Sequence, residues 1–255
     1  MHDVLDDLET AWHAGRSVGL ATLTSTWHSA PRPPGATMLV DEARIVSRVR
    51  HANVVPLLDV LAEDGELWLV MEYVHGESLA RLLRRATEPP PAPIAVAILC
   101  GVLHGLHAAH EALDRDGAPL HIIHRDVSPQ NILVGDDGAP RVIDFGVAKA
   151  RGRLQTTLVG QIKGKPAYMA PEQIQGARDA DPRADVWALG IMLYELLAGQ
   201  LPFEAEDAPS LFYAVATQDV PPLSKAAPVP TTVSTIVAVV TSGEDSTTRA
   251  LSPAR

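Results

Sequence analysis

Two short motifs near the middle of the chain constrain its fold more than any other feature. The first runs from His124 to Asn131 and reads His-Arg-Asp-Val-Ser-Pro-Gln-Asn, and the second, Asp-Phe-Gly, begins at Asp144. Between them, the strand-like segments 132–134 and 141–143 predict a small hairpin. Such a hairpin would bring the polar residues of both motifs to one place.

The residue types in these motifs suit the transfer of a phosphoryl group. Asp126 can accept the proton of a substrate hydroxyl, while Asn131 and Asp144 offer oxygen atoms to Mg²⁺. Magnesium needs only one or two protein ligands, because phosphates and water complete its octahedron. A base beside a magnesium site is what phosphoryl transfer requires. A third motif, Ala-Pro-Glu at residues 170–172, follows in the same order.

Together these motifs resemble those of protein kinases, and residues 41–250 are similar to bacterial serine/threonine kinases of the eukaryotic type. The resemblance implies ATP and Mg²⁺ as cofactors and a protein substrate that carries serine or threonine. It implies an α+β, kinase-like fold with a small β-rich N-lobe and an α-helical C-lobe. It also implies that Asp126 is the base and that Asn131 and Asp144 are metal ligands.

The resemblance extends to a nucleotide site. Residues 71–74 look like the gatekeeper and the hinge that binds an adenine edge. Nucleotide binding is accordingly implied for Met71, Glu72, Val74 and Leu133.

Several other positions match structural or regulatory residues of the family. Glu42 matches the glutamate of helix C, His124 and Phe145 match a regulatory spine, and Asp185 matches a buried anchor beneath the catalytic loop. Glu172 and Arg249 resemble an ion pair that fastens the activation segment to the lower lobe. Glu42 and Arg249 could equally be ordinary solvated helix charges.

The upper half of the expected site departs from the family pattern. No segment before Glu42 resembles a glycine-rich phosphate loop, and the first lysine of the chain is Lys149. Arg16 and Arg32 could offer positive charge, but an arginine fork differs from an ammonium in length and geometry. The N-lobe is therefore expected to be truncated or replaced, and phosphate transfer to be impaired. The alternatives are a non-catalytic pseudokinase that binds partners and a chimera without function.

A second departure suggests an exchange of two side chains. In the family a lysine follows the catalytic aspartate by two residues, where this chain has Ser128, and a threonine stands where this chain has Lys165. The two positions face each other across the substrate site in the family. We expect Lys165 to contact the γ-phosphate and Ser128 to supply the hydroxyl. The alternative is that Lys165 points to solvent.

The expected activation segment, residues 144–172, carries Thr156 and Thr157 close to Arg151 and Arg153. A phosphate on either threonine could pair with Arg125 and order the segment. Ordinary polar surface threonines are the alternative.

The first forty residues resemble a different family. The stretches 19–26 and 29–40, the second of which contains Ser-Ala-Pro-Arg-Pro-Pro-Gly, are similar to the start of xanthine dehydrogenase accessory proteins, which chaperone molybdenum cofactor. An unrelated leader is the alternative. The expected organisation is a foreign segment at 1–40, a remnant kinase N-lobe at 41–74 and a kinase C-lobe at 75–255. Strands at 18–26 and 38–40 could pair with the shortened upper sheet and cover its exposed edge.

Hydrophobic patterns predict the remaining elements. Helices are expected at 41–49, from near Glu77, and at 94–111, 184–198, 208–217 and 231–240, with strands at 54–62 and 67–74.

Composition restricts the other functions that the chain could have. The formal net charge of −10 argues against binding to nucleic acid. The single cysteine, Cys100, is expected to be buried in the 94–106 stretch, and it fits a reducing cytosol. His104 and His107 interrupt the longest apolar run, so we expect no membrane span and a cytoplasmic location. With His110, they are interpreted as helix-surface residues, because three such positions do not converge on a metal.

Overall fold

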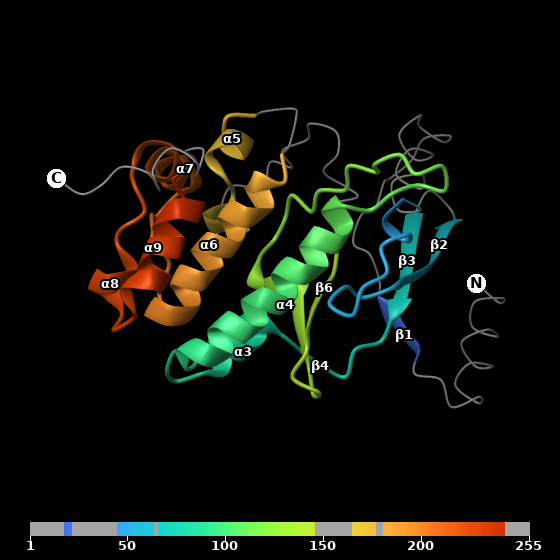
Figure 1. Cartoon of the computed structure of the whole chain (residues 1–255), viewed down its shortest axis with the longest axis horizontal. Coiled ribbons are helices and arrows are strands. Elements are labelled where there is room, and N and C mark those ends of the chain that lie inside the picture. Colours follow the sequence, from blue (N-terminus) through green and yellow to red (C-terminus); the bar gives the residue numbers. More distant parts are fainter. Residues whose placement is uncertain (1–17, 22–44, 64–65, 146–164, 177–180, 243–255) are drawn as a thin grey trace.

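The computed structural model describes residues 18–21, 45–63, 66–145, 165–176 and 181–242. A small antiparallel sheet lies at one end of the molecule and a group of helices at the other (Figure 1). The sheet contains β1 (Val18–Ala21), β2 (Leu57–Glu63) and β3 (Glu66–Glu72), in the order β1-β3-β2. β1 pairs with β3 from Val18 opposite Glu72 to Ala21 opposite Leu69. The expectation that this part of the chain adds a strand to the upper sheet is therefore confirmed for residues 18–21.

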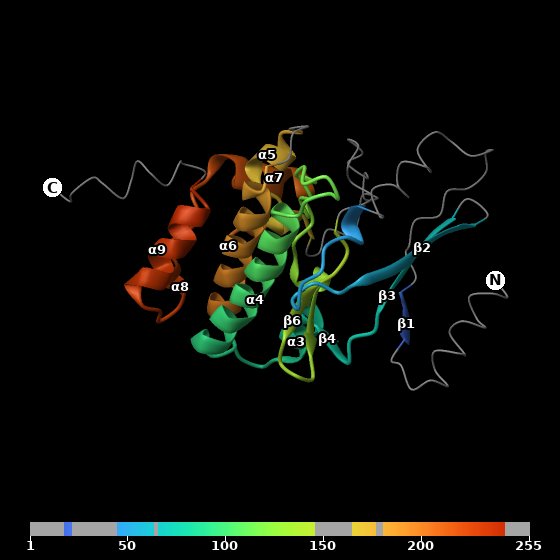
Figure 2. The ribbon, with the colours of Figure 1, turned by 45° about the vertical axis from the view of Figure 1, so that its right-hand side comes forward.

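A second antiparallel sheet lies between the first sheet and the helices (Figure 2). Its strands are β4 (Gly76–Ser78), β5 (Ile132–Gly135) and β6 (Pro140–Val142). Gly138, with φ of 78°, takes the left-handed conformation in the turn between β5 and β6, as glycine can without strain. The hairpin expected from the sequence is confirmed. The helix expected from Glu77 begins later, at Leu79, because residues 76–78 pair with β5 instead.

The helical part is built around two long helices. The described helices are α3 (Leu79–Arg85), α4 (Ala92–His110), α5 (Pro171–Ile174), α6 (Arg183–Ala198), α7 (Ala208–Thr217), α8 (Leu223–Ala226) and α9 (Thr231–Val240). α4 lies beside α6, and α9 packs against α6 (Figure 2). The helices at 94–111, 184–198, 208–217 and 231–240 are thus confirmed within a few residues.

One face of α4 forms much of the core. Its buried residues follow the three-to-four-residue spacing of an amphipathic helix: Ala95, Ile98, Leu99, Val102, Gly105, Leu106 and Ala109. Cys100 lies off this face and is exposed, so the prediction of a buried thiol is wrong.

α4 is also long and apolar enough to cross a membrane by length and composition. His104 and His107 therefore do not interrupt the apolar run as expected, because two histidines do not offset the aliphatic residues around them, and the expectation of no membrane span stays a prediction. One face of the helix packs on α6 and β6, and 33% of the apolar window is buried.

Candidate catalytic loop and metal site

The loop that carries Asp126 is closed by the side chain of Asn131. The Asn131 amide nitrogen donates to the Asp126 carbonyl at 2.7 Å and to the Asp126 carboxylate at 3.2 Å. Pro129–Asn131 form a short 3₁₀ turn, η1, which leads directly into β5. Asn131 is 3% exposed, so the bonds that hold Asp126 are shielded from water. The structure therefore brings the expected base and one expected metal ligand into contact.

His124 holds both neighbours of Asp144. Its Nε2 donates to the Ile143 carbonyl at 2.9 Å, and its ring lies 4.8 Å from the Phe145 ring, centroid to centroid. The Ile143 N–H donates to the Asn131 carbonyl at 3.0 Å. Asp144 therefore follows a residue that is bonded to Asn131, and the end of the hairpin places the two expected metal ligands close together in the fold.

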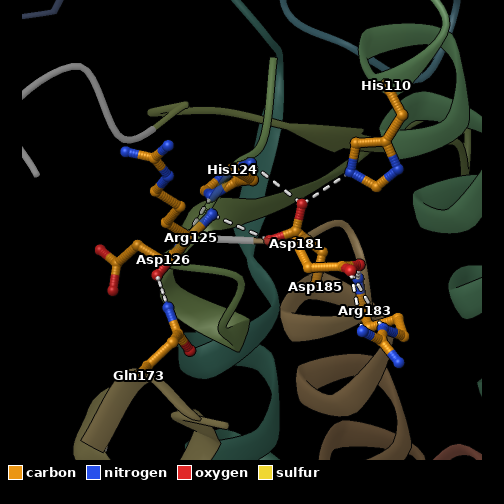
Figure 3. A network of polar contacts seen from close by, with 8 residues as sticks. All are labelled: His110, His124, Arg125, Asp126, Gln173, Asp181, Arg183 and Asp185. Atoms are coloured by element: carbon orange, nitrogen blue, oxygen red, sulfur yellow. Dashed lines mark hydrogen bonds and ion pairs between the residues drawn. The ribbon is translucent and has the colours of Figure 1, made fainter. Parts of the chain in front are cut away.

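A buried carboxylate on α6 holds the same loop from below (Figure 3). Asp185, 1% exposed, accepts from the backbone N–H of His124 at 2.9 Å and from that of Arg125 at 2.8 Å. His110 Nε2 lies 2.8 Å from Asp185 Oδ2, the same oxygen that accepts from the His124 N–H, while the Arg125 N–H donates to Oδ1. Three donors thus surround a carboxylate that is almost entirely buried, as a charge inside a protein requires.

Backbone strain is concentrated at these loops. Among the described residues, the non-glycine residues with positive φ are His121 (50°), Arg125 (64°) and Asp144 (56°). Residues with a Cβ rarely take this backbone conformation. They keep it where the surrounding hydrogen bonds and packing fix the chain. Two of the three flank or form the expected catalytic groups.

The helix α5, at the end of the activation segment, contacts the catalytic loop through Gln173. Its Oε1 accepts from the Ala170 N–H at 2.9 Å, and its Nε2 donates to the Arg125 carbonyl at 2.9 Å. Figure 3 shows this side chain reaching from α5 to the loop. Glu172, the neighbouring residue in the Ala-Pro-Glu motif, is half-buried.

A second bond ties the same region to α6. The Tyr168 hydroxyl donates to Glu195 at 2.5 Å, and the tyrosine is 5% exposed. Burial raises the pKa of Glu195, and the bond from Tyr168 offsets part of that rise. Burial and the nearby Glu195 carboxylate raise the pKa of Tyr168.

The raised pKa of Glu195 predicts a pH effect on stability. Because the unfolded chain ionises this carboxyl at a lower pH than the folded chain, its contribution to stability is complete below the ordinary value of 4.5 and is lost as pH rises through the folded pKa. Glu195→Gln stays neutral and still accepts from Tyr168. The melting temperature of Glu195→Gln minus that of the wild type is therefore expected to rise by a few degrees from pH 4.5 to pH 8. Glu206→Gln, at an exposed position, is the control, and an equal gain in both variants would contradict the prediction.

The expected nucleotide residues lie on two adjoining segments. Met71 and Glu72 end β3, and Val74 lies just before β4, whose Ser78 pairs with Leu133 of β5. β4 therefore connects the hinge-like segment to the β5–β6 hairpin, which starts at Ile132, directly after Asn131. β1, the strand beside β3, reads Val-Gly-Leu-Ala and supplies no cation.

Other predicted residues are only partly described. Ser128 is 1% exposed, and its hydroxyl has no hydrogen-bond partner within the described part of the chain. Lys165 begins the 3₁₀ turn η2 (Lys165–Tyr168), but its side chain is not among those described. Glu42, Thr156, Thr157 and Arg249 lie outside the described residues, as do Arg16 and Arg32.

Sequence reasoning missed three residues at this site: His110, Gln173 and Glu195. The surface interpretation holds for His104 and His107, which are exposed, but it is wrong for His110, whose side chain is only 13% exposed. His110 follows Leu106 by one turn and therefore lies at the margin of the buried face. For Gln173, the signal was its place in the first turn of the helix that begins at Pro171, where glutamine often caps the backbone.

The chain belongs to the protein kinase domain family, whose model matches residues 28–242. The match confirms the kinase resemblance and the α+β fold class. It also starts before residue 41, inside the segment for which a separate origin was expected.

Individual relatives agree with this family. The chain is 40% identical over 183 residues to the tyrosine-protein kinase MasK of Myxococcus xanthus, covering 71% of this chain and 28% of the relative. It is 40% identical over 180 residues to the serine/threonine-protein kinase PknL of Mycobacterium tuberculosis (71% and 43%) and 37% identical over 196 residues to pkn3 of M. xanthus (73% and 34%). The chain thus spans less than half the length of these curated relatives.

Proposed function

We propose that this chain transfers the γ-phosphate of ATP to serine or threonine hydroxyls of a protein substrate. The rate is reduced because the sequence has no glycine-rich loop and no lysine before Lys149 to hold the nucleotide phosphates. The observation that carries the proposal is the catalytic loop, in which Asn131 holds Asp126 by two bonds and His124 fixes both neighbours of Asp144. Two of the relatives named above are serine/threonine kinases by name and one is a tyrosine kinase. Phosphoamino-acid analysis of a labelled substrate distinguishes the two acceptors.

Asp126 is the proposed base. Its carboxylate accepts the proton of the substrate hydroxyl while that oxygen bonds to the γ-phosphorus, and the bond from phosphorus to the bridging oxygen breaks as ADP leaves. The bonds from Asn131 limit the rotation of this carboxylate. A base that is fixed in this way needs less reorganisation during the reaction.

Asn131 and Asp144 are the proposed ligands of Mg²⁺, and their chemistry fits that ion. Both offer hard oxygen atoms, and Asn131 uses its nitrogen for Asp126, which leaves Oδ1 as the ligand atom. Bound Mg²⁺ would neutralise charge on the phosphates. Asp144 is exposed, so its carboxylate is accessible to an ion that arrives with its nucleotide.

The adenine is expected to lie against Met71, Glu72, Val74 and Leu133. No cation from β1 reaches the phosphates in this arrangement, and Lys165 is the proposed substitute, with Ser128 at the facing position. The buried, unbonded hydroxyl of Ser128 supports a polar contact there with substrate or phosphate. Lys165→Met should then lower the rate of phosphate transfer.

Arg125 is the proposed partner of a phosphate on Thr156 or Thr157. Its Nε is buried and has no hydrogen-bond partner among the described residues, which leaves a charged group available for an anion. Mass spectrometry after incubation with an active kinase tests the modification.

A second candidate is a binding module that holds nucleotide or partners without catalysis. The observation that favours it is the sequence of β1, which gives the strand beside the hinge no lysine. A preserved set of Asp126, Asn131 and Asp144 favours catalysis.

Asp126→Asn separates these candidates. It is expected to abolish phosphate transfer while the melting temperature still rises on addition of Mg²⁺-ATP, because binding stabilises the folded state by mass action. A thermal shift without transfer in the wild type supports the binding module. A wild type that shows neither shift nor transfer contradicts both candidates.

The first forty residues are proposed to have an origin separate from the kinase domain, and no cofactor-chaperone activity is assigned to them. Sequencing the source locus across codons 20–60 with long reads tests this: kinase codons that continue upstream without this segment would support the separate origin, and an unbroken frame that carries this segment in the source and in related kinase loci would contradict it.

A further inference from the structure

We propose that Gln173 is a positioning residue for Asp126, acting by holding the carbonyl of Arg125. This inference rests on the proposed function and adds a residue to its site. The contact joins two segments far apart in the sequence, the catalytic loop and the short helix that follows the activation segment.

The backbone of Arg125 has to be held because it lies in the left-handed region, with φ of 64°. A residue with a Cβ stays there only when bonds on both sides fix the chain. The Arg125 N–H donates to the Asp185 carboxylate at 2.8 Å, and the Arg125 carbonyl accepts from Gln173 Nε2 at 2.9 Å. The two polar groups of this one residue are therefore held by side chains from α6 and α5.

The carbonyl of Arg125 belongs to the same peptide group as the nitrogen of Asp126. A rotation of that peptide would change the direction in which the Asp126 carboxylate points, and it would disturb the bond from the Asp126 N–H to His124 Nδ1, which is 3.3 Å long. Figure 3 shows the Asp126 carboxylate turned away from Asp185. Gln173 thus acts on the base without contacting the reacting atoms.

Only an amide at position 173 makes both contacts. The oxygen accepts from the Ala170 N–H and the nitrogen donates to the Arg125 carbonyl, so the side chain has a single suitable orientation. A glutamate could still accept from Ala170, as glutamate does in helix caps, but it would place a carboxylate oxygen against the Arg125 carbonyl. Gln173→Glu therefore keeps the hydrogen bond from the Ala170 N–H and removes the hydrogen bond to the Arg125 carbonyl.

The experiment compares Gln173→Glu with Gln175→Glu, which adds the same charge at an exposed position of the same segment, and with Gln173→Ala. Hydrogen exchange of peptides covering residues 124–128 is expected to speed up at least tenfold in both Gln173 variants and to remain unchanged in Gln175→Glu. The melting temperature of Gln173→Glu is expected to stay within about 2 °C of the wild type. Unchanged exchange in Gln173→Glu, or equal acceleration in Gln175→Glu, would overturn the proposal.

A kinetic measurement on the same variants adds a second readout. Where the wild type transfers phosphate, Gln173→Glu is expected to lower kcat about tenfold with an unchanged KM for ATP, because the loop and not the nucleotide contact has changed. A parallel rise in KM for ATP would contradict the assignment. The exchange measurement needs no activity, so an inactive wild type would defeat the proposed function and leave this inference to be decided by exchange alone.

Discussion

Asp185→Ala is expected to lower the free energy of unfolding by about 3–5 kcal/mol, the range found when one member of a buried charged network is removed. The carboxylate is 1% exposed and accepts from the backbone of His124 and Arg125 while it contacts His110. Alanine leaves these donors buried without an acceptor, and each unsatisfied group costs about 1–3 kcal/mol. For a domain of this size the melting temperature should fall by about 6–20 °C.

Asp181→Asn is the matched control for this prediction. Asp181 lies just before the same helix, but its side chain is 43% exposed and its partner Arg183 is 73% exposed. Exposed ion pairs contribute about 0–1 kcal/mol, so the control should melt close to the wild type. Asp185→Asn should fall between the two, because its remaining oxygen can accept from only part of the set. Equal losses in the Asp181 and Asp185 variants would show that Asp185 is no anchor of the loop.

The sequence predicted the order of elements well because hydrophobic periodicity dominates long helices. α6 and α9 were located within a residue, and the β5–β6 hairpin followed from the strand-like segments 132–134 and 141–143. Periodicity failed for single positions on α4. Cys100 and His110 depend on where the buried face of the helix ends, and that depends on the angle at which α6 and β6 pack against it.

The sequence predicted the motif residues of the site but not the hydrogen bonds that join them to other elements. Motif spacing identified Asp126, Asn131 and Asp144. Their residue types indicate a base and two oxygen ligands for Mg²⁺. The contacts of Gln173 and Glu195 could not be derived in this way, since each joins segments separated by a part of the chain with no local pattern. Strain was equally hidden: nothing in the local sequence favours positive φ at Arg125, and the bonds that impose it come from other elements.

His124→Ala is expected to destabilise the chain by about 3–5 kcal/mol, comparable to the loss of a buried aromatic ring. The side chain is 0% exposed and packs against Phe145, so alanine leaves a cavity beside the Asp-Phe-Gly motif. The variant also removes the donor to the Ile143 carbonyl and the acceptor for the Asp126 N–H. Equilibrium unfolding in denaturant measures the difference.

His124→Phe separates packing from hydrogen bonding at the same position. Phenylalanine keeps a ring against Phe145 but can neither donate to the Ile143 carbonyl nor accept from the Asp126 N–H. The expected loss is that of these two hydrogen bonds, about 1–3 kcal/mol for each polar group left buried and unsatisfied. Hydrogen exchange of peptides covering residues 142–145 should increase in both variants, because Ile143 and Phe145 are the two neighbours through which His124 holds Asp144. If His124→Phe were as stable and as protected as the wild type, the polar bonds would not fix Asp144, and ring packing alone would account for its position.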